Sequence, residues 1–104
     1  MDKQIQLKVP RWMKTRLREI TERDGDTMTN YVLDAMQAHA TTAPELPDEA
    51  DALIHLRDNS VGSEILRLAE QAALLRYGST RRARNRIVRA ALAEAMRRDS
   101  DDGR

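Results

Sequence analysis

Residues 4–10 read QIQLKVP and combine the pattern of a short strand with the start of a helix. Ile5, Leu7 and Val9 alternate with polar residues, which is the period-two pattern of a β-strand with one apolar and one polar face. Pro10 cannot donate a hydrogen bond to a strand ladder, so we expect the strand to end there. Because proline is also favoured in the first turn of a helix, the sequence predicts a strand that passes directly into a helix.

Two helices are predicted after this strand. Over residues 11–24 the apolar side chains recur every three or four positions, which places them on one side of a helix. Gly25 suits the left-handed conformation in which many helices end. Thr27 stands where the N-cap of a second helix belongs, and that helix is predicted over about residues 28–40.

A lone strand leaves its backbone hydrogen-bonding groups without partners. Antiparallel pairing with the strand of a second copy satisfies them, turns the apolar face towards the helices and leaves Gln4, Gln6 and Lys8 pointing outward. A two-stranded ribbon fits the DNA major groove, where Gln can bind adenine and Lys can bind guanine. We therefore expect a homodimer with an intersubunit ribbon that contacts double-stranded DNA. The alternative for this polar face is simple exposure to solvent.

Over residues 3–40, the order of strand, helix, Gly-Thr turn and helix resembles the ribbon-helix-helix family, of which Arc, MetJ and CopG are members. The resemblance is to the Arc repressor in particular. It implies that the outward strand residues Gln4, Gln6 and Lys8 contact bases. The chain departs from Arc at Lys8, where Arc has Arg, and it continues for about sixty residues beyond Arc's pattern.

The resemblance also implies a set of phosphate contacts. Free N–H groups and the positive end of the dipole make a helix N-terminus an anion site. The family clamps a DNA phosphate on its second helix, which here implies the backbone N–H groups of Met28 and Thr29 and the hydroxyl of Thr27. Lys3 and Arg11 are also expected to contact DNA phosphates.

Composition divides the chain into four segments. A ribbon-helix-helix DNA-binding domain is predicted over residues 1–41, a Pro/acidic linker over 42–51, a helical C-terminal region over 52–98 and an acidic tail over 99–104. The expected fold class is thus mainly α. Helices are predicted on either side of Gly78 and Ser79, over residues 61–77 and 80–98.

The start of the C-terminal region is ambiguous. Residues 52–58, ALIHLRD, fit either a helix, which we favour, or a strand. The sequence IHLR at 54–57 has the same order as IQLK at 5–8, and residues 85–96 resemble the second helix of a ribbon-helix-helix unit. A second such unit is therefore an alternative, and a tandem arrangement is known in relaxosome accessory proteins of the family.

Arginine is concentrated late in the chain. Residues 76–98 hold eight Arg and one Glu, whereas residues 42–75 hold seven acidic and two basic side chains. One interpretation is a second basic surface for nucleic acid. Its members would be Arg81, Arg82, Arg84, Arg86 and Arg89. The other interpretation is that these arginines pair with the acidic segment.

The residue inventory points away from catalysis. The chain has no Cys, and its two histidines, His39 and His55, have no companions at metal-ligand spacing. We recognise no nucleophile–base pair and no Gly-rich phosphate loop, so we expect no enzyme, no metal and no cofactor. No apolar run approaches the roughly 18 residues of a membrane span. We expect a cytoplasmic protein associated with the nucleoid or a plasmid.

The most specific hypothesis is a sequence-specific transcriptional repressor whose dimers block polymerase, with higher-order assembly on DNA. Two alternatives share the DNA-binding head. One is an antitoxin that binds its toxin through residues 45–98, and the other is a plasmid partition or relaxosome accessory protein. A helical interaction module that binds no DNA is the alternative from a different class.

Overall fold

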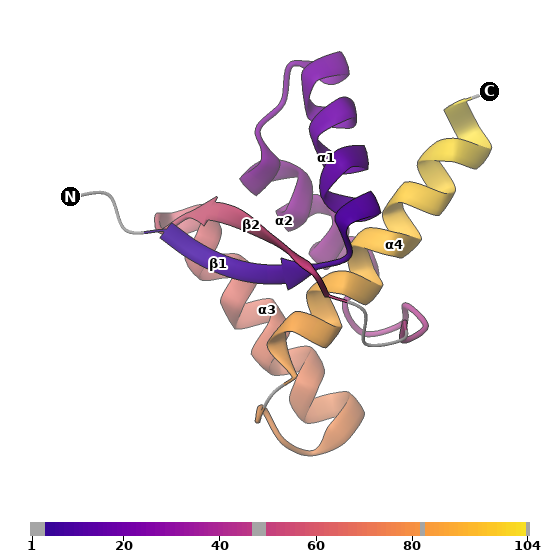
Figure 1. Cartoon of the computed structure of the whole chain (residues 1–104). Helices are drawn as coiled ribbons and strands as arrows, with labels where there is room; N and C mark the ends of the chain where they lie inside the picture. Colours follow the sequence, from indigo (N-terminus) through magenta and orange to yellow (C-terminus); the bar gives the residue numbers. More distant parts are fainter. Residues whose placement is uncertain (1–3, 47–49, 82, 104) are drawn as a thin grey trace.

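The computed structural model describes residues 4–46, 50–81 and 83–103, the last four of these for their backbone only. Two strands and four helices follow one another in the order strand–helix–helix, strand–helix–helix (Figure 1). Their bounds are β1 Gln4–Val9, α1 Arg11–Asp24, α2 Met28–His39, β2 Ala52–Arg57, α3 Ser60–Tyr77 and α4 Arg84–Gly103. The protein is therefore mainly helical, with a two-stranded antiparallel sheet.

The residues predicted to end the first helix and to begin the second are confirmed in these roles. Gly25 ends α1 in the left-handed conformation, with φ of 66°. Thr27 is the N-cap of α2, and its hydroxyl oxygen accepts a hydrogen bond from the Asn30 backbone N–H at 3.1 Å. Gly78, with φ of 70°, ends α3 in the same way that Gly25 ends α1.

The two strands pair with each other inside one chain, which corrects the expectation of an intersubunit ribbon. β1 runs antiparallel to β2, with Gln4 opposite Arg57 and Val9 opposite Ala52. The helices α1 and α2 return the chain to the edge of β1, so the second strand reaches it without a second copy. The unpaired backbone groups that motivated the homodimer are therefore satisfied within the chain.

The preference for a helix over residues 52–58 is wrong, because Ala52–Arg57 form β2. Ile54 and Leu56 are buried, whereas Leu53, His55 and Arg57 are exposed, which is the alternation of a strand. A helix would have left β1 without a partner, and this tertiary pairing decides the structure of an ambiguous local sequence. The prediction of a separate acidic tail over residues 99–104 is also wrong, because α4 continues to Gly103.

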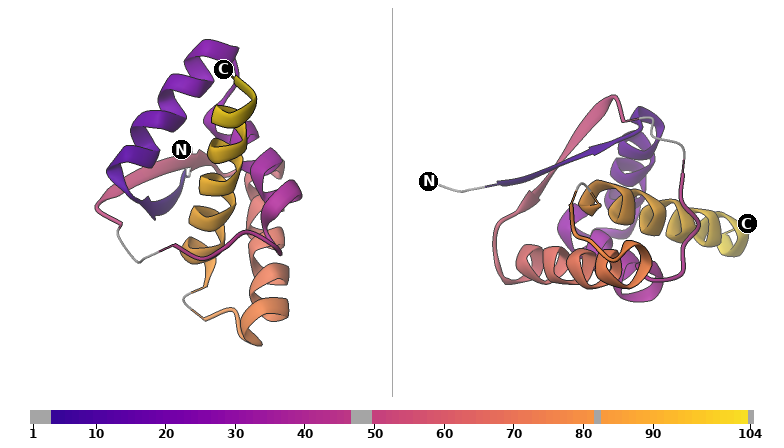
Figure 2. Two further views of the ribbon diagram at one scale, coloured as in Figure 1. Left: turned by 90° about the vertical axis from the view of Figure 1, so that its right-hand side faces the viewer. Right: turned by 90° about the horizontal axis from the view of Figure 1, so that it is seen from below.

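A single hydrophobic core joins the two halves of the chain. The apolar faces of both strands lie on helices, and α2 packs against α3 and α4. Figure 2, in its right-hand view, shows the ribbon on one side of the molecule with α3 and α4 beneath it. This arrangement buries one face of the ribbon and leaves its other face uncovered.

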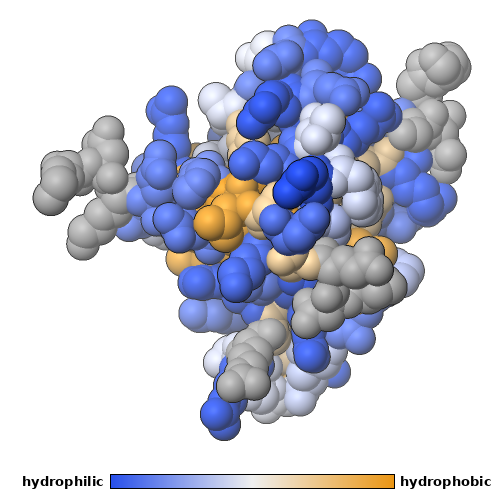
Figure 3. Space-filling model, viewed as in Figure 1, coloured by the Kyte–Doolittle hydropathy of each residue, from blue (hydrophilic) through white to orange (hydrophobic). Residues whose placement is uncertain are grey.

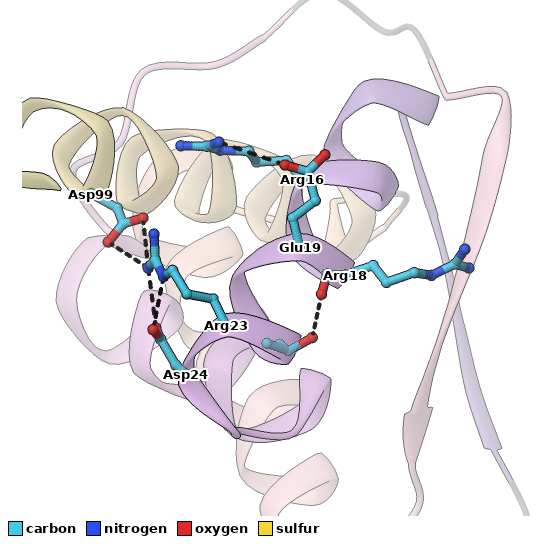
Figure 4. Close-up of polar contacts among 7 residues, drawn as sticks. Arg16, Arg18, Glu19, Arg23, Asp24 and Asp99 are labelled. Carbon is cyan, nitrogen blue, oxygen red and sulfur yellow. Dashed lines mark hydrogen bonds and ion pairs between the residues drawn. The ribbon is translucent and has the colours of Figure 1, made fainter. Parts of the chain in front are cut away.

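A polar contact holds the end of α1 against α4. The Arg23 side chain donates to the Asp24 carboxylate at 2.9 Å and to that of Asp99 at 3.3 Å (Figure 4). These hydrogen bonds raise the pKa of Arg23, and the bond from Arg23 lowers the pKa of Asp24. Because the contact is exposed, it contributes little to the free energy of unfolding, and its main effect is to orient α1 relative to α4.

Candidate nucleic-acid interface

The uncovered face of the ribbon carries six side chains in three cross-strand pairs. Gln4, Gln6 and Lys8, which were predicted from β1, are all exposed and lie on this face. The register sets three residues of β2 opposite them, and these are also exposed. The pairs are Gln4 with Arg57, Gln6 with His55 and Lys8 with Leu53.

Figure 3 views the molecule from the side of this face and shows a mostly hydrophilic surface with a small hydrophobic area near its centre. The sequence prediction missed Leu53, His55 and Arg57 as site residues. The repeated order IQLK and IHLR was the signal that could have found them, because it marks the same strand positions in both halves.

Each end of the ribbon lies against the N-terminus of a helix from the other half. At one end the backbone N–H of Arg57 donates to the Thr29 hydroxyl oxygen at 3.1 Å. At the other end the backbone N–H of Lys8 donates to Asn85 Oδ1 at 3.2 Å. Thr29 is the second residue of α2 and Asn85 the second residue of α4, so the two halves are related by an approximate two-fold axis.

The N-terminus of α2 contains the predicted phosphate contacts Thr27, Met28 and Thr29. The first N–H groups of a helix have no partner within it and attract anions. The Thr27 hydroxyl accepts from Asn30, and Thr29 is buried with its hydroxyl bound to the Arg57 N–H. Any anion here would therefore bind through backbone N–H groups more than through these two side-chain oxygens.

Two further residues were assigned to phosphate. Arg11 is exposed, and its backbone N–H donates to Asp51 Oδ1 at 2.8 Å, while its Nε lies 3.9 Å from Oδ2 of the same carboxylate. Asp51 thus satisfies the first N–H of α1 where Pro10 offers no side-chain cap, and it partly neutralises Arg11. Lys3 lies outside the described residues.

The late arginines separate into two environments. Arg84 and Arg86 are exposed in the first turn of α4, on either side of Asn85, which contacts the Lys8 end of the ribbon, and Arg81 is exposed in the loop before this helix. No ion pair joins these three to an acidic side chain within the part of the chain that the structure describes. Arg84 and Arg86 therefore add positive charge near the Lys8 end of the ribbon. Arg82 lies outside the described residues.

Arg89 is not one of these exposed arginines, which corrects its assignment to a basic surface. Its side chain is 4 % exposed, and Nη1 donates to the backbone carbonyl of Lys8 at 3.5 Å. One helical turn of α4 separates it from the exposed Arg86, but it points to the strand instead of to solvent. Charge counting along the sequence does not distinguish these two orientations.

Among the described residues, no group of three His, Cys, Asp or Glu side chains is placed to hold a metal ion. The same residues include no helix with the length and apolar character needed to cross a membrane. Comparison with family models, with curated proteins and with solved structures gives no match.

Proposed function

We propose that this protein binds double-stranded DNA in a sequence-specific manner, with the uncovered face of the ribbon in the major groove, and acts as a transcriptional repressor. The observation that carries the proposal is the set of six exposed side chains on a two-stranded ribbon. An isolated two-stranded ribbon of this width fits the major groove and can present donors and acceptors to base edges. Repression would follow from occlusion of the polymerase.

Charge and helix placement support this orientation. The N-termini of α2 and α4 lie at opposite ends of the ribbon, where backbone N–H groups can hold phosphates on both sides of the groove. Arg84 and Arg86 add positive charge at one of these positions. Because the ribbon closes within one chain, we propose that a single chain is the DNA-reading unit, in place of the homodimer expected from the sequence.

The test compares binding to the DNA upstream of the protein's own gene with binding to random DNA, by fluorescence anisotropy at several salt concentrations. Specific binders favour their site by roughly a thousandfold or more. The variant Gln6→Ala/Lys8→Ala should lose this preference. The matched control Gln37→Ala/Arg98→Ala also removes one glutamine and one positive charge, from exposed positions on α2 and α4, and should keep it. Equal loss in both variants would contradict base recognition by the ribbon.

A second candidate function is that of a relaxosome accessory protein, which binds plasmid transfer-origin DNA. The specific observation in its favour is the presence of two strand–helix–helix units in one chain. A transfer-origin duplex in the same anisotropy assay distinguishes the two roles. The antitoxin alternative lacks comparable support, because residues 52–98 contribute to the common core instead of forming a separate toxin-binding tail.

A further inference from the structure

We infer that the ribbon recognises a non-palindromic DNA site, because its two ends carry different chemistry. The inference rests on the proposed function and specifies its ligand. The approximate two-fold axis passes through the central pair, Gln6 and His55, which occupy equivalent positions of β1 and β2. A ribbon with exact two-fold symmetry would present the same pair of side chains at both ends.

The two ends of this ribbon differ in hydrogen-bonding capacity. At one end Gln4 lies opposite Arg57, and at the other Lys8 lies opposite Leu53. Arg binds guanine O6 and N7 in a bidentate manner, and Gln binds adenine N6 and N7. The Gln4–Arg57 end can therefore make two bidentate base contacts and is suited to adjacent purines.

The Lys8–Leu53 end is suited to a different sequence. Leu53 is 37 % exposed, and an apolar side chain in the major groove contacts the methyl group of thymine. Lys8 provides a single flexible point charge, so it discriminates between bases less sharply than Arg57 does. This end thus favours thymine at the position that Leu53 contacts, while Lys8 binds a neighbouring guanine or a phosphate.

The flanks of the ribbon increase the asymmetry. The Lys8–Leu53 end lies against the start of α4, with Arg84 and Arg86 exposed there. The Gln4–Arg57 end lies against the start of α2, whose first turn, Met28 to Asn30, carries no charged side chain. Phosphate attraction is therefore stronger at the Lys8–Leu53 end, whereas base recognition is stronger at the Gln4–Arg57 end. Together they fix one orientation of the protein on its site.

The experiment is selection from duplexes with a randomised centre of about ten base pairs, close to one helical turn. The full chain is used, and only complexes of one chain with one duplex are recovered from a native gel and sequenced. We expect a motif that differs from its own reverse complement. Inverting one half of that motif should weaken binding by about 5- to 160-fold per mismatched base pair.

Each contrary result has its own meaning. An enriched palindromic motif in the one-to-one complex overturns the inference and leaves base recognition intact. The absence of any enriched motif overturns the proposed function itself. Complexes that form only with two chains per duplex also overturn the inference, because it requires one chain to cover both halves of the site.

A symmetrised variant tests the same inference by gain of symmetry. Leu53→Gln combined with Lys8→Arg gives both ends the same Gln and Arg pair, so the two ends of the selected motif should become reverse complements of each other, while the central base pairs opposite Gln6 and His55 stay asymmetric. The control Leu75→Gln/Lys14→Arg makes the same two changes away from the ribbon, on α3 and α1, and should keep the asymmetric motif. If the symmetrised variant folds, as judged by circular dichroism, and still selects the wild-type motif, the inference is wrong.

Discussion

The Thr29 hydroxyl accepts a hydrogen bond from the backbone N–H of Arg57, and this contact joins the second helix of one half to the strand of the other. Its counterpart joins Asn85 of α4 to Lys8 of β1. Each half of the chain thus holds the strand of the other half at the end of the ribbon. The exposed face is positioned by these two contacts and by the core beneath it.

Thr29→Val should destabilise the fold. Valine has nearly the same shape but cannot accept a hydrogen bond, so the part-buried Arg57 N–H would lose its partner, at a cost of about 1–3 kcal/mol. Urea denaturation followed by circular dichroism measures the change. The control Thr41→Val lies at an exposed position and should stay within about 0.5 kcal/mol of wild type. Equal stability of Thr29→Val and wild type would show that this bond contributes nothing.

Gly62→Ala should also destabilise the fold. A Cβ atom at this position would lie 2.0 Å from the Arg57 carbonyl oxygen and 2.9 Å from Ile5 Cδ1, so α3 would have to move away from β2. Overpacking of this kind costs about 1–3 kcal/mol and occasionally more. The neighbouring exposed change Ser63→Ala is the control in the same urea experiment. A Gly62→Ala protein as stable as the control would contradict the close approach of α3 to β2.

Local signals predicted the first half of the fold, whereas the second half depended on a contact distant in sequence. Pro10, Gly25 and Thr27 mark boundaries through backbone chemistry that acts within a few residues. Residues 52–57 have no comparable local signal, and they form a strand because β1 offers a partner. The outward residues of β2 were missed for the same reason. Arg89 was assigned to the surface because charge alone does not reveal which side chains of a helix point to solvent and which point to the core.

Acid should weaken the fold between about pH 4.5 and pH 2. Hydrogen bonds from Arg97 and Arg98 lower the pKa of Glu94 to about 2, from an ordinary value of 4.5. A carboxyl whose pKa is lower in the folded state stabilises that state above its unfolded pKa, and this stabilisation is lost as pH falls through the folded pKa. Urea midpoints measured across this range should therefore decline, and Glu94→Gln should flatten the decline. An unchanged slope in Glu94→Gln would contradict a role for this group.

Arg84→Ala/Arg86→Ala should weaken DNA binding without changing which sequence is preferred. These exposed side chains lie beside the ribbon, where we propose that they neutralise phosphates. Loss of two phosphate contacts makes the negative slope of log K against log salt less steep by about 1.8. The control Arg97→Ala/Arg98→Ala removes the same charge from the distant part of α4 and should leave the slope close to that of wild type. Equal effects of both pairs would mean that net charge alone governs binding.

The isolated protein should be a monomer of 11.9 kDa at micromolar concentration. Pairing of β1 with β2 satisfies the backbone of both strands, and the core collects the apolar faces of all six elements, so the fold needs no second copy. Sedimentation equilibrium over a range of concentrations measures the mass directly. The same measurement with a short DNA duplex should add the mass of one chain per duplex. A dimer that persists at the lowest concentration would restore the two-copy arrangement expected from the first strand alone.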